Sequence, residues 1–147
     1  MFRELAGGIA HAERDVCQGR MQRSMAVITA FAAIVSGGEA YSQHIRGAFD
    51  GWLMWTPVWL TPPMTLAAAA AFFNRSAART LLPFMSMAIM FDGVLGFIMH
   101  LRGIKRMPGG YRAGFYNIVI GPPILAPLLT CTVGFLGLFA AGPPRER

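Results

Sequence analysis

Charge is scarce in this chain, and long stretches of it carry none. Asp, Glu, Lys and Arg make up 14% of the 147 residues, against about 25% in an average soluble protein. The segments 51–74 and 113–144 contain no charged side chain, and between Thr80 and Leu101 there is only Asp92. Soluble helices need a polar face towards water. The pattern therefore argues against a soluble bundle and predicts a membrane protein.

Motifs for several kinds of chemistry are also missing. The only two cysteines are Cys17, before the first apolar segment, and Cys131, within the last. A disulfide or a redox pair between them is not expected. The sequence has no Gly-rich phosphate loop, Cys-x-x-Cys pair or Gly-x-Ser-x-Gly nucleophile motif. These absences favour a role other than catalysis.

Basic residues outnumber acidic ones by 13 to 7, which gives a formal net charge of +6. On a soluble domain such an excess can indicate nucleic-acid binding. Here the basic residues lie in the gaps between apolar segments, as in membrane proteins, so we expect a lipid bilayer and no nucleic acid as partner.

Four segments reach the roughly 20 apolar residues that cross a bilayer, and they are 24–43, 53–73, 80–101 and 115–141.

A short motif occurs twice in the apolar part of the chain. Residues 37–47 read GGEAYSQHIRG and residues 93–103 read GVLGFIMHLRG, and each copy closes in His-(Ile/Leu)-Arg-Gly. Each copy is followed by a second apolar segment with a proline pair, Pro62-Pro63 in the first and Pro122-Pro123 in the second. Prolines inside a helix remove a backbone donor, so we expect a kink at each pair.

The duplication predicts an all-α fold. Residues 24–141 are expected to form a four-helix transmembrane bundle built from two tandem helical hairpins, repeat 1 at about 24–73 and repeat 2 at about 80–141. Residues 1–23 precede it as an amphipathic, interfacial helix. Its apolar stripe consists of Phe2, Leu5, Ile9, Ala12 and Val16. Residues 142–147 are a short basic tail.

The basic residues and tryptophans give the expected placement in the membrane. Four spans put both termini on one side, and that side holds more arginines, which predicts cytoplasmic termini. Twelve arginines against one lysine hint at a high-GC bacterial genome, and hence at a bacterial cytoplasmic (inner) membrane. The residues expected at the other interface are Arg46, Arg102, Trp52, Trp55 and Trp59.

Two histidines occupy matching positions in the two copies, 56 residues apart. If the first and third spans run in the same direction, His44 and His100 lie at equal depth near one surface. Two opposed imidazoles can ligate a b-type haem iron, and imidazole also binds other transition metals. The alternative is that each histidine lies at a helix C-terminus, where the helix dipole favours it, and binds nothing.

Acidic and polar residues within the spans are further candidates. Glu39 lies five residues before His44, within a span, where a carboxylate costs roughly 2.5–3.5 kcal/mol unless it is paired. Together with His44 and His100 it gives a candidate set of three metal ligands, and a structural hydrogen bond to another helix is the alternative. The other intramembrane polar candidates are Asp92, Tyr41 and Asn117.

Three functions are compatible with these features. The first is a non-catalytic accessory or anchoring subunit of a larger membrane complex, with partner subunits or a homo-oligomer. The second is a cofactor- or metal-binding membrane protein that uses His44 and His100 with Glu39. The third is a small dimeric transporter, because duplicated hairpins with broken helices and an embedded acid occur in transporters.

Overall fold

The computed structural model describes residues 4, 7, 8 and 19–142. The predictions for residues 1–23 and 142–147 fall almost wholly outside this part and stay predictions. Within the described residues the regular structure is helical, without strands, so the all-α prediction is confirmed. The helices are α2 (Arg20–Arg46), η1 (Trp52–Trp55), α3 (Thr56–Phe73), α4 (Arg75–Arg79), α5 (Leu81–Arg106), η2 (Gly110–Ala113), α6 (Gly114–Ile120) and α7 (Leu125–Ala141).

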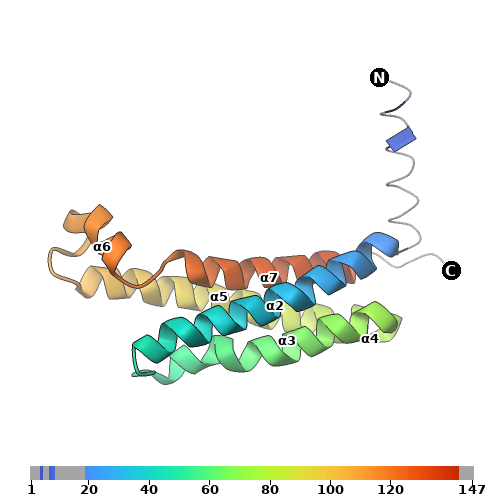
Figure 1. Ribbon diagram of the computed structural model, residues 1–147, viewed down its shortest axis with the longest axis horizontal. Coiled ribbons are helices and arrows are strands. Elements are labelled where there is room, and N and C mark those ends of the chain that lie inside the picture. Colours follow the sequence, from blue (N-terminus) through green and yellow to red (C-terminus); the bar gives the residue numbers. More distant parts are fainter. Residues whose placement is uncertain (1–3, 5–6, 9–18, 143–147) are drawn as a thin grey trace.

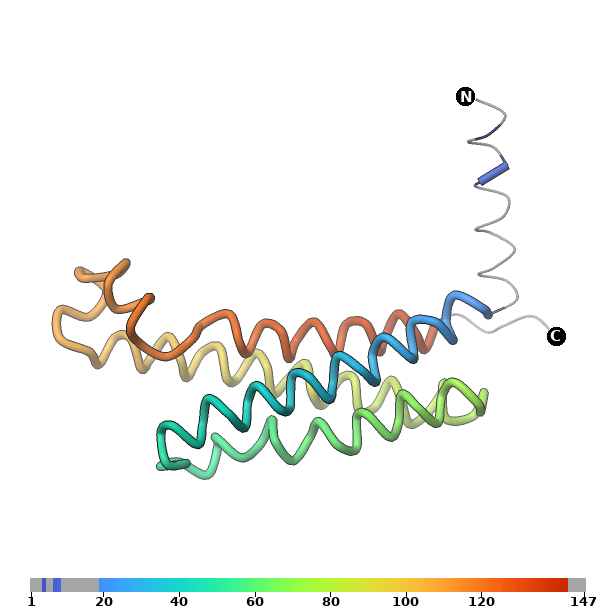
Figure 2. The backbone as a smooth tube through the Cα atoms, viewed as in Figure 1, coloured from blue at the N-terminus to red at the C-terminus, as the bar shows by residue number. Residues whose placement is uncertain are grey.

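The long helices α2, α3, α5 and α7 lie side by side along the molecule (Figure 1). Helix α2 packs against α3 and α7, and α5 packs against the same two helices. Helices α2 and α5, which carry the two copies of the repeated motif, therefore occupy diagonal corners of the bundle. The short α6 lies at the far end of α5, away from the end at which α4 lies (Figure 2).

Among the described helices, α2 and α5 are long and apolar enough to cross a membrane. The stretch Gly110–Ile120 and α7 together make a third candidate span, bent by 70°. The 18-residue α3 is not among the candidate spans, because its prolines and threonines lower its mean hydropathy. The prediction of four spans is thus confirmed in part, for two or three of them.

Large apolar side chains cover the outside of the bundle. Phe31 of α2, Leu66 of α3 and Phe91 of α5 are each about 70% exposed. Small residues fill the inside, where Ala33 and Ala67 are fully buried. This inversion of the usual soluble pattern is expected where helices pack through small residues and present apolar side chains to lipid.

The two proline pairs affect their helices differently. Helix α3 runs through Pro62 and Pro63 without a break. Pro62 has no N–H to offer the carbonyl of Val58 one turn earlier, and the hydroxyl of Thr61 donates to that carbonyl instead, at 3.4 Å. The kink expected at this pair does not interrupt the helix.

At the second pair the helix breaks completely. Gly121 stands where the first copy has Thr61 and offers no hydroxyl. Its backbone is extended, with φ −88° and ψ −162°, and α6 ends before it. The sequence predicts a kink at this pair within the span 115–141, and the structure goes further, because Pro122 and Pro123 separate α6 from α7.

Candidate functional site

A cavity of about 590 Å³ opens between the helices near the end of α2. Both copies of the repeated motif line it, and so do the start of α3 and the proline break before α7. Its walls are mostly apolar, and polar side chains gather at its deep end and at its mouth. The volume lies within the range of about 300–1,000 Å³ that is usual for small-molecule sites.

His44 and His100 face each other across this cavity. Their ring centroids are 6.3 Å apart and the ring planes are nearly perpendicular, at 83°. The two rings come from α2 and α5, the diagonal helices. The prediction that the repeat brings both imidazoles to one depth agrees with this geometry.

One backbone carbonyl group orients the ring of His100. Its Nδ1 is hydrogen bonded to the carbonyl oxygen of Pro123, at 2.8 Å. The usual helical donor to that oxygen, the N–H four residues later, is missing at Pro127, and the oxygen also accepts a hydrogen bond from the N–H of Ala126 at 3.3 Å. The helix break before α7 therefore supplies the group that holds His100.

His44 is held less completely. Its Nδ1 is buried and has no hydrogen-bond partner, although the backbone of Met54 interacts with the ring. In the part of the chain that the structure describes, the nitrogen without a hydrogen-bond partner is therefore Nδ1 in His44 and Nε2 in His100. Both rings line the cavity, and a metal-binding imidazole requires one such nitrogen.

The deep end of the cavity is polar. Asp92 of α5 is only 7% exposed and accepts a hydrogen bond from the hydroxyl of Thr56 at the start of α3. The hydroxyl groups of Ser36 on α2 and Thr130 on α7 are hydrogen bonded to each other at 3.2 Å. All four residues line the cavity. Each hairpin's first helix is thereby linked to the second helix of the other hairpin.

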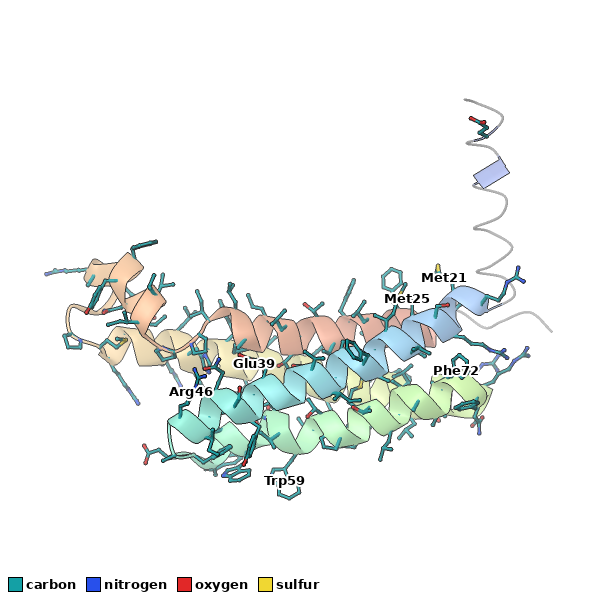
Figure 3. The ribbon with its side chains drawn as sticks, in the orientation of Figure 1. Met21, Met25, Glu39, Arg46, Trp59 and Phe72 are labelled. Atoms are coloured by element: carbon teal, nitrogen blue, oxygen red, sulfur yellow. The ribbon has the colours of Figure 1, made fainter. Side chains whose placement is uncertain are left out.

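Glu39 does not join the histidines as predicted. It is an exposed residue on α2 (Figure 3), and its Oε1 accepts a hydrogen bond from Nε2 of Gln43 at 2.6 Å. Its partner is therefore one turn away on its own helix and not on another helix. Although Glu39, His44 and His100 line one cavity, no group of three His, Cys, Asp or Glu residues within the described ranges is arranged to hold a metal.

Two other predicted polar residues, Asn117 and Tyr41, make contacts outside the cavity. Asn117 is 1% exposed, and its amide donates to the carbonyl groups of Pro108 and Gly110 at 3.0 and 2.8 Å. It therefore ties the loop after α5 to α6. Tyr41 is 45% exposed, and its ring lies 5.8 Å from that of Phe49. Neither residue is among those that line the cavity.

Of the predicted interfacial residues, Trp52 and Arg102 line the cavity. Trp52 and Trp59 are at least 70% exposed, and Trp59 points away from the bundle (Figure 3). Trp55 stacks on Phe49 with ring centroids 3.9 Å apart. Arg46 and Arg102 are both exposed. These placements suit a polar–apolar boundary at this end of the helices.

Sequence reasoning missed several residues that line the cavity, among them Thr56, Thr130 and Arg106. The two threonines lie in helices without any charged neighbour, and only the packing of α3 and α7 brings them to Asp92 and Ser36. The signal for Arg106 was present, because it follows Arg102 by one helical turn.

Comparison of the chain with protein-family models, with curated proteins and with solved structures found no match.

Proposed function

We propose that this chain is a membrane protein that binds a planar metal cofactor, a b-type haem, between His44 and His100. The observation that carries the proposal is the pair of cavity-lining imidazoles on diagonal helices, with ring centroids 6.3 Å apart and with Nδ1 of His44 buried without a hydrogen-bond partner. Two protein imidazoles on opposite faces are a known way to hold haem iron. The bound group would supply one-electron redox chemistry.

The spacing of the two rings fits this role. A metal–imidazole bond is about 2 Å long and the ring centroid lies about 1 Å behind its nitrogen, so opposed ligands of one ion have centroids about 6 Å apart. The observed separation is 6.3 Å. The hydrogen bond from Nδ1 of His100 to the carbonyl of Pro123 also fits, because metal-binding histidines usually use their second nitrogen in this way.

We propose further that the bundle crosses a bacterial cytoplasmic membrane four times. Helix α3 then crosses beside α2, with which it packs along its length. Its prolines are compatible with a crossing, because the Thr61 hydroxyl satisfies a carbonyl that they free. Both termini would lie in the cytoplasm, and the cavity mouth would open to the other side, near Trp52 and Trp59.

A haem titration of the purified full-length chain tests the proposal. We expect one haem per chain with the absorption spectrum of iron that has two imidazole ligands. Either His44→Ala or His100→Ala should remove this spectrum and lower the affinity at least tenfold, the equivalent of about 1.4 kcal/mol. A wild-type chain that binds no haem, or variants that keep the same spectrum, would contradict the proposal.

The two other functions inferred from the sequence stay predictions. An anchoring subunit is compatible with the apolar outer surface, and a haem-binding chain can also be a subunit of a larger complex. A transporter is compatible with Asp92, which is buried at the deep end of the cavity. The facing histidines favour the cofactor-binding role over both.

A further inference from the structure

One wall of the cavity mouth carries two arginines. Arg102 and Arg106 both line the cavity from α5, and both are exposed. They are one helical turn apart, so they project from the same face of the helix. Within the described part of the chain neither guanidinium has a salt bridge or a hydrogen bond. Two cations are thus free to bind an anionic group at the mouth.

The opposite wall, on α2, is different although it comes from the other copy of the motif. Arg46 is the counterpart of Arg102 but does not line the cavity. The counterpart of Arg106 is Asp50. The charged side chain that α2 does contribute to the lining is Glu39, an acid. Among the residues that line the cavity, the positive charges are therefore on the α5 side.

We infer that Arg102 and Arg106 bind carboxylate groups of the ligand that His44 and His100 hold. The inference rests on the proposed function, since haem is an apolar ring with two propionate carboxylates on one edge. The cavity has the complementary arrangement, with apolar walls and paired guanidinium groups on one side of the mouth. Arginine is suited to this task because its planar fork binds a carboxylate through two hydrogen bonds.

The placement also sets the orientation of the ligand. Carboxylates on the α5 side would be attracted by Arg102 and Arg106, whereas on the α2 side they would meet the negative charge of Glu39. The apolar edge of the ring would then face the interior of the bundle. Such an arrangement keeps both carboxylates at the membrane surface, where water and cations reach them.

Titration of the detergent-solubilised full-length chain with haem and with haem dimethyl ester tests the inference. The ester keeps the iron and the ring but has no carboxylate. For the double variant Arg102→Gln/Arg106→Gln we expect haem affinity to fall at least tenfold while affinity for the ester stays unchanged. Arg46→Gln is the matched control and should bind both compounds like the wild type. Arg102→Lys/Arg106→Lys keeps the charge and should retain most of the haem affinity.

The outcomes separate this inference from the proposed function. If the wild type binds haem with its two-imidazole spectrum and the double Gln variant binds it equally tightly, the arginine inference is overturned and the histidine proposal stands. An equal loss of affinity for haem and for the ester would also overturn it, because the arginines would then act on the fold. If the wild type binds neither compound, the proposed function itself fails.

Discussion

At the residue scale, the side chains at the deep end of the cavity form two hydrogen-bonded pairs between helices. Asp92 accepts from Thr56, and Ser36 pairs with Thr130. A buried carboxyl group without a partner costs more than a hydrogen bond contributes. The hydroxyl of Thr56, at the start of α3, therefore compensates for the burial of Asp92 on α5.

Replacing Thr56 by Val tests this pair. The change preserves the shape of the side chain and removes the hydroxyl donor, so we expect the free energy of unfolding to fall by about 1–3 kcal/mol. Thr132→Val is the control, because Thr132 is exposed and donates only to the carbonyl of Leu128 on its own helix. Thermal unfolding in detergent, followed by circular dichroism, measures both. Equal stability of the two variants would show that the Thr56–Asp92 contact does not stabilise the fold.

A second residue-scale prediction concerns Glu39. Because Gln43 already binds its carboxylate and Glu39 is exposed, Glu39→Gln should leave the haem spectrum and the haem content unchanged. Absorption and iron analysis of the purified variant measure this. Loss of the cofactor would instead restore Glu39 as a ligand beside the two histidines.

At the element scale, the same proline pair has two outcomes, and the residues before the two pairs differ. Thr61 supplies a hydroxyl to the carbonyl that Pro62 leaves free, and α3 continues. Gly121 has none, and the chain bends by 70° between α6 and α7. The break exposes the carbonyl of Pro123, which binds His100. An interruption of regular structure thus positions a functional side chain.

Close contact between α5 and α7 depends on Gly93. A Cβ atom at this position would lie 2.6 Å from Sγ of Cys131 and 2.7 Å from the carbonyl oxygen of Pro127. Gly93→Ala should therefore separate the two helices, lower stability by about 1–3 kcal/mol and weaken haem binding. Gly38→Ala is its control, since nothing lies within 4 Å of the added Cβ. If both variants unfold at the same temperature, the helix contact is looser than described.

At the scale of the whole molecule, the repeat explains how two short motifs make one cavity. Its copies lie on α2 and α5, which packing places at opposite corners, so the matching histidines face each other. The exposed aromatic residues around the outside and the small residues inside are compatible with helices that contact lipid.

Cysteine labelling tests the four crossings. In a chain with Cys17 and Cys131 replaced by Ser, single cysteines at Arg46, Arg75 and Arg102 would be exposed to an impermeant thiol reagent in sealed vesicles. We expect positions 46 and 102 to react from one side and position 75 from the other. If α3 does not cross, positions 46 and 75 will react from the same side.

The sequence predicts the helical class, the duplication and the meeting of the two histidines, because spacing and apolar length determine these features directly. The sequence does not predict features that depend on local backbone geometry or on which side chains meet in the folded bundle. Spacing alone does not distinguish the continuous helix at Pro62-Pro63 from the break at Pro122-Pro123, where the backbone of Gly121 is extended, and the partner of Glu39 is a residue of the same helix. Thr56 and Thr130 enter the cavity only through tertiary packing.

The most direct measurement of the central claim is the absorption and electron paramagnetic resonance spectrum of the protein purified from its native membrane, without added haem. We predict one iron per chain with low-spin signals from two axial imidazoles, absent when either His44 or His100 is replaced by Ala. A colourless, metal-free protein with both histidines intact would contradict the account.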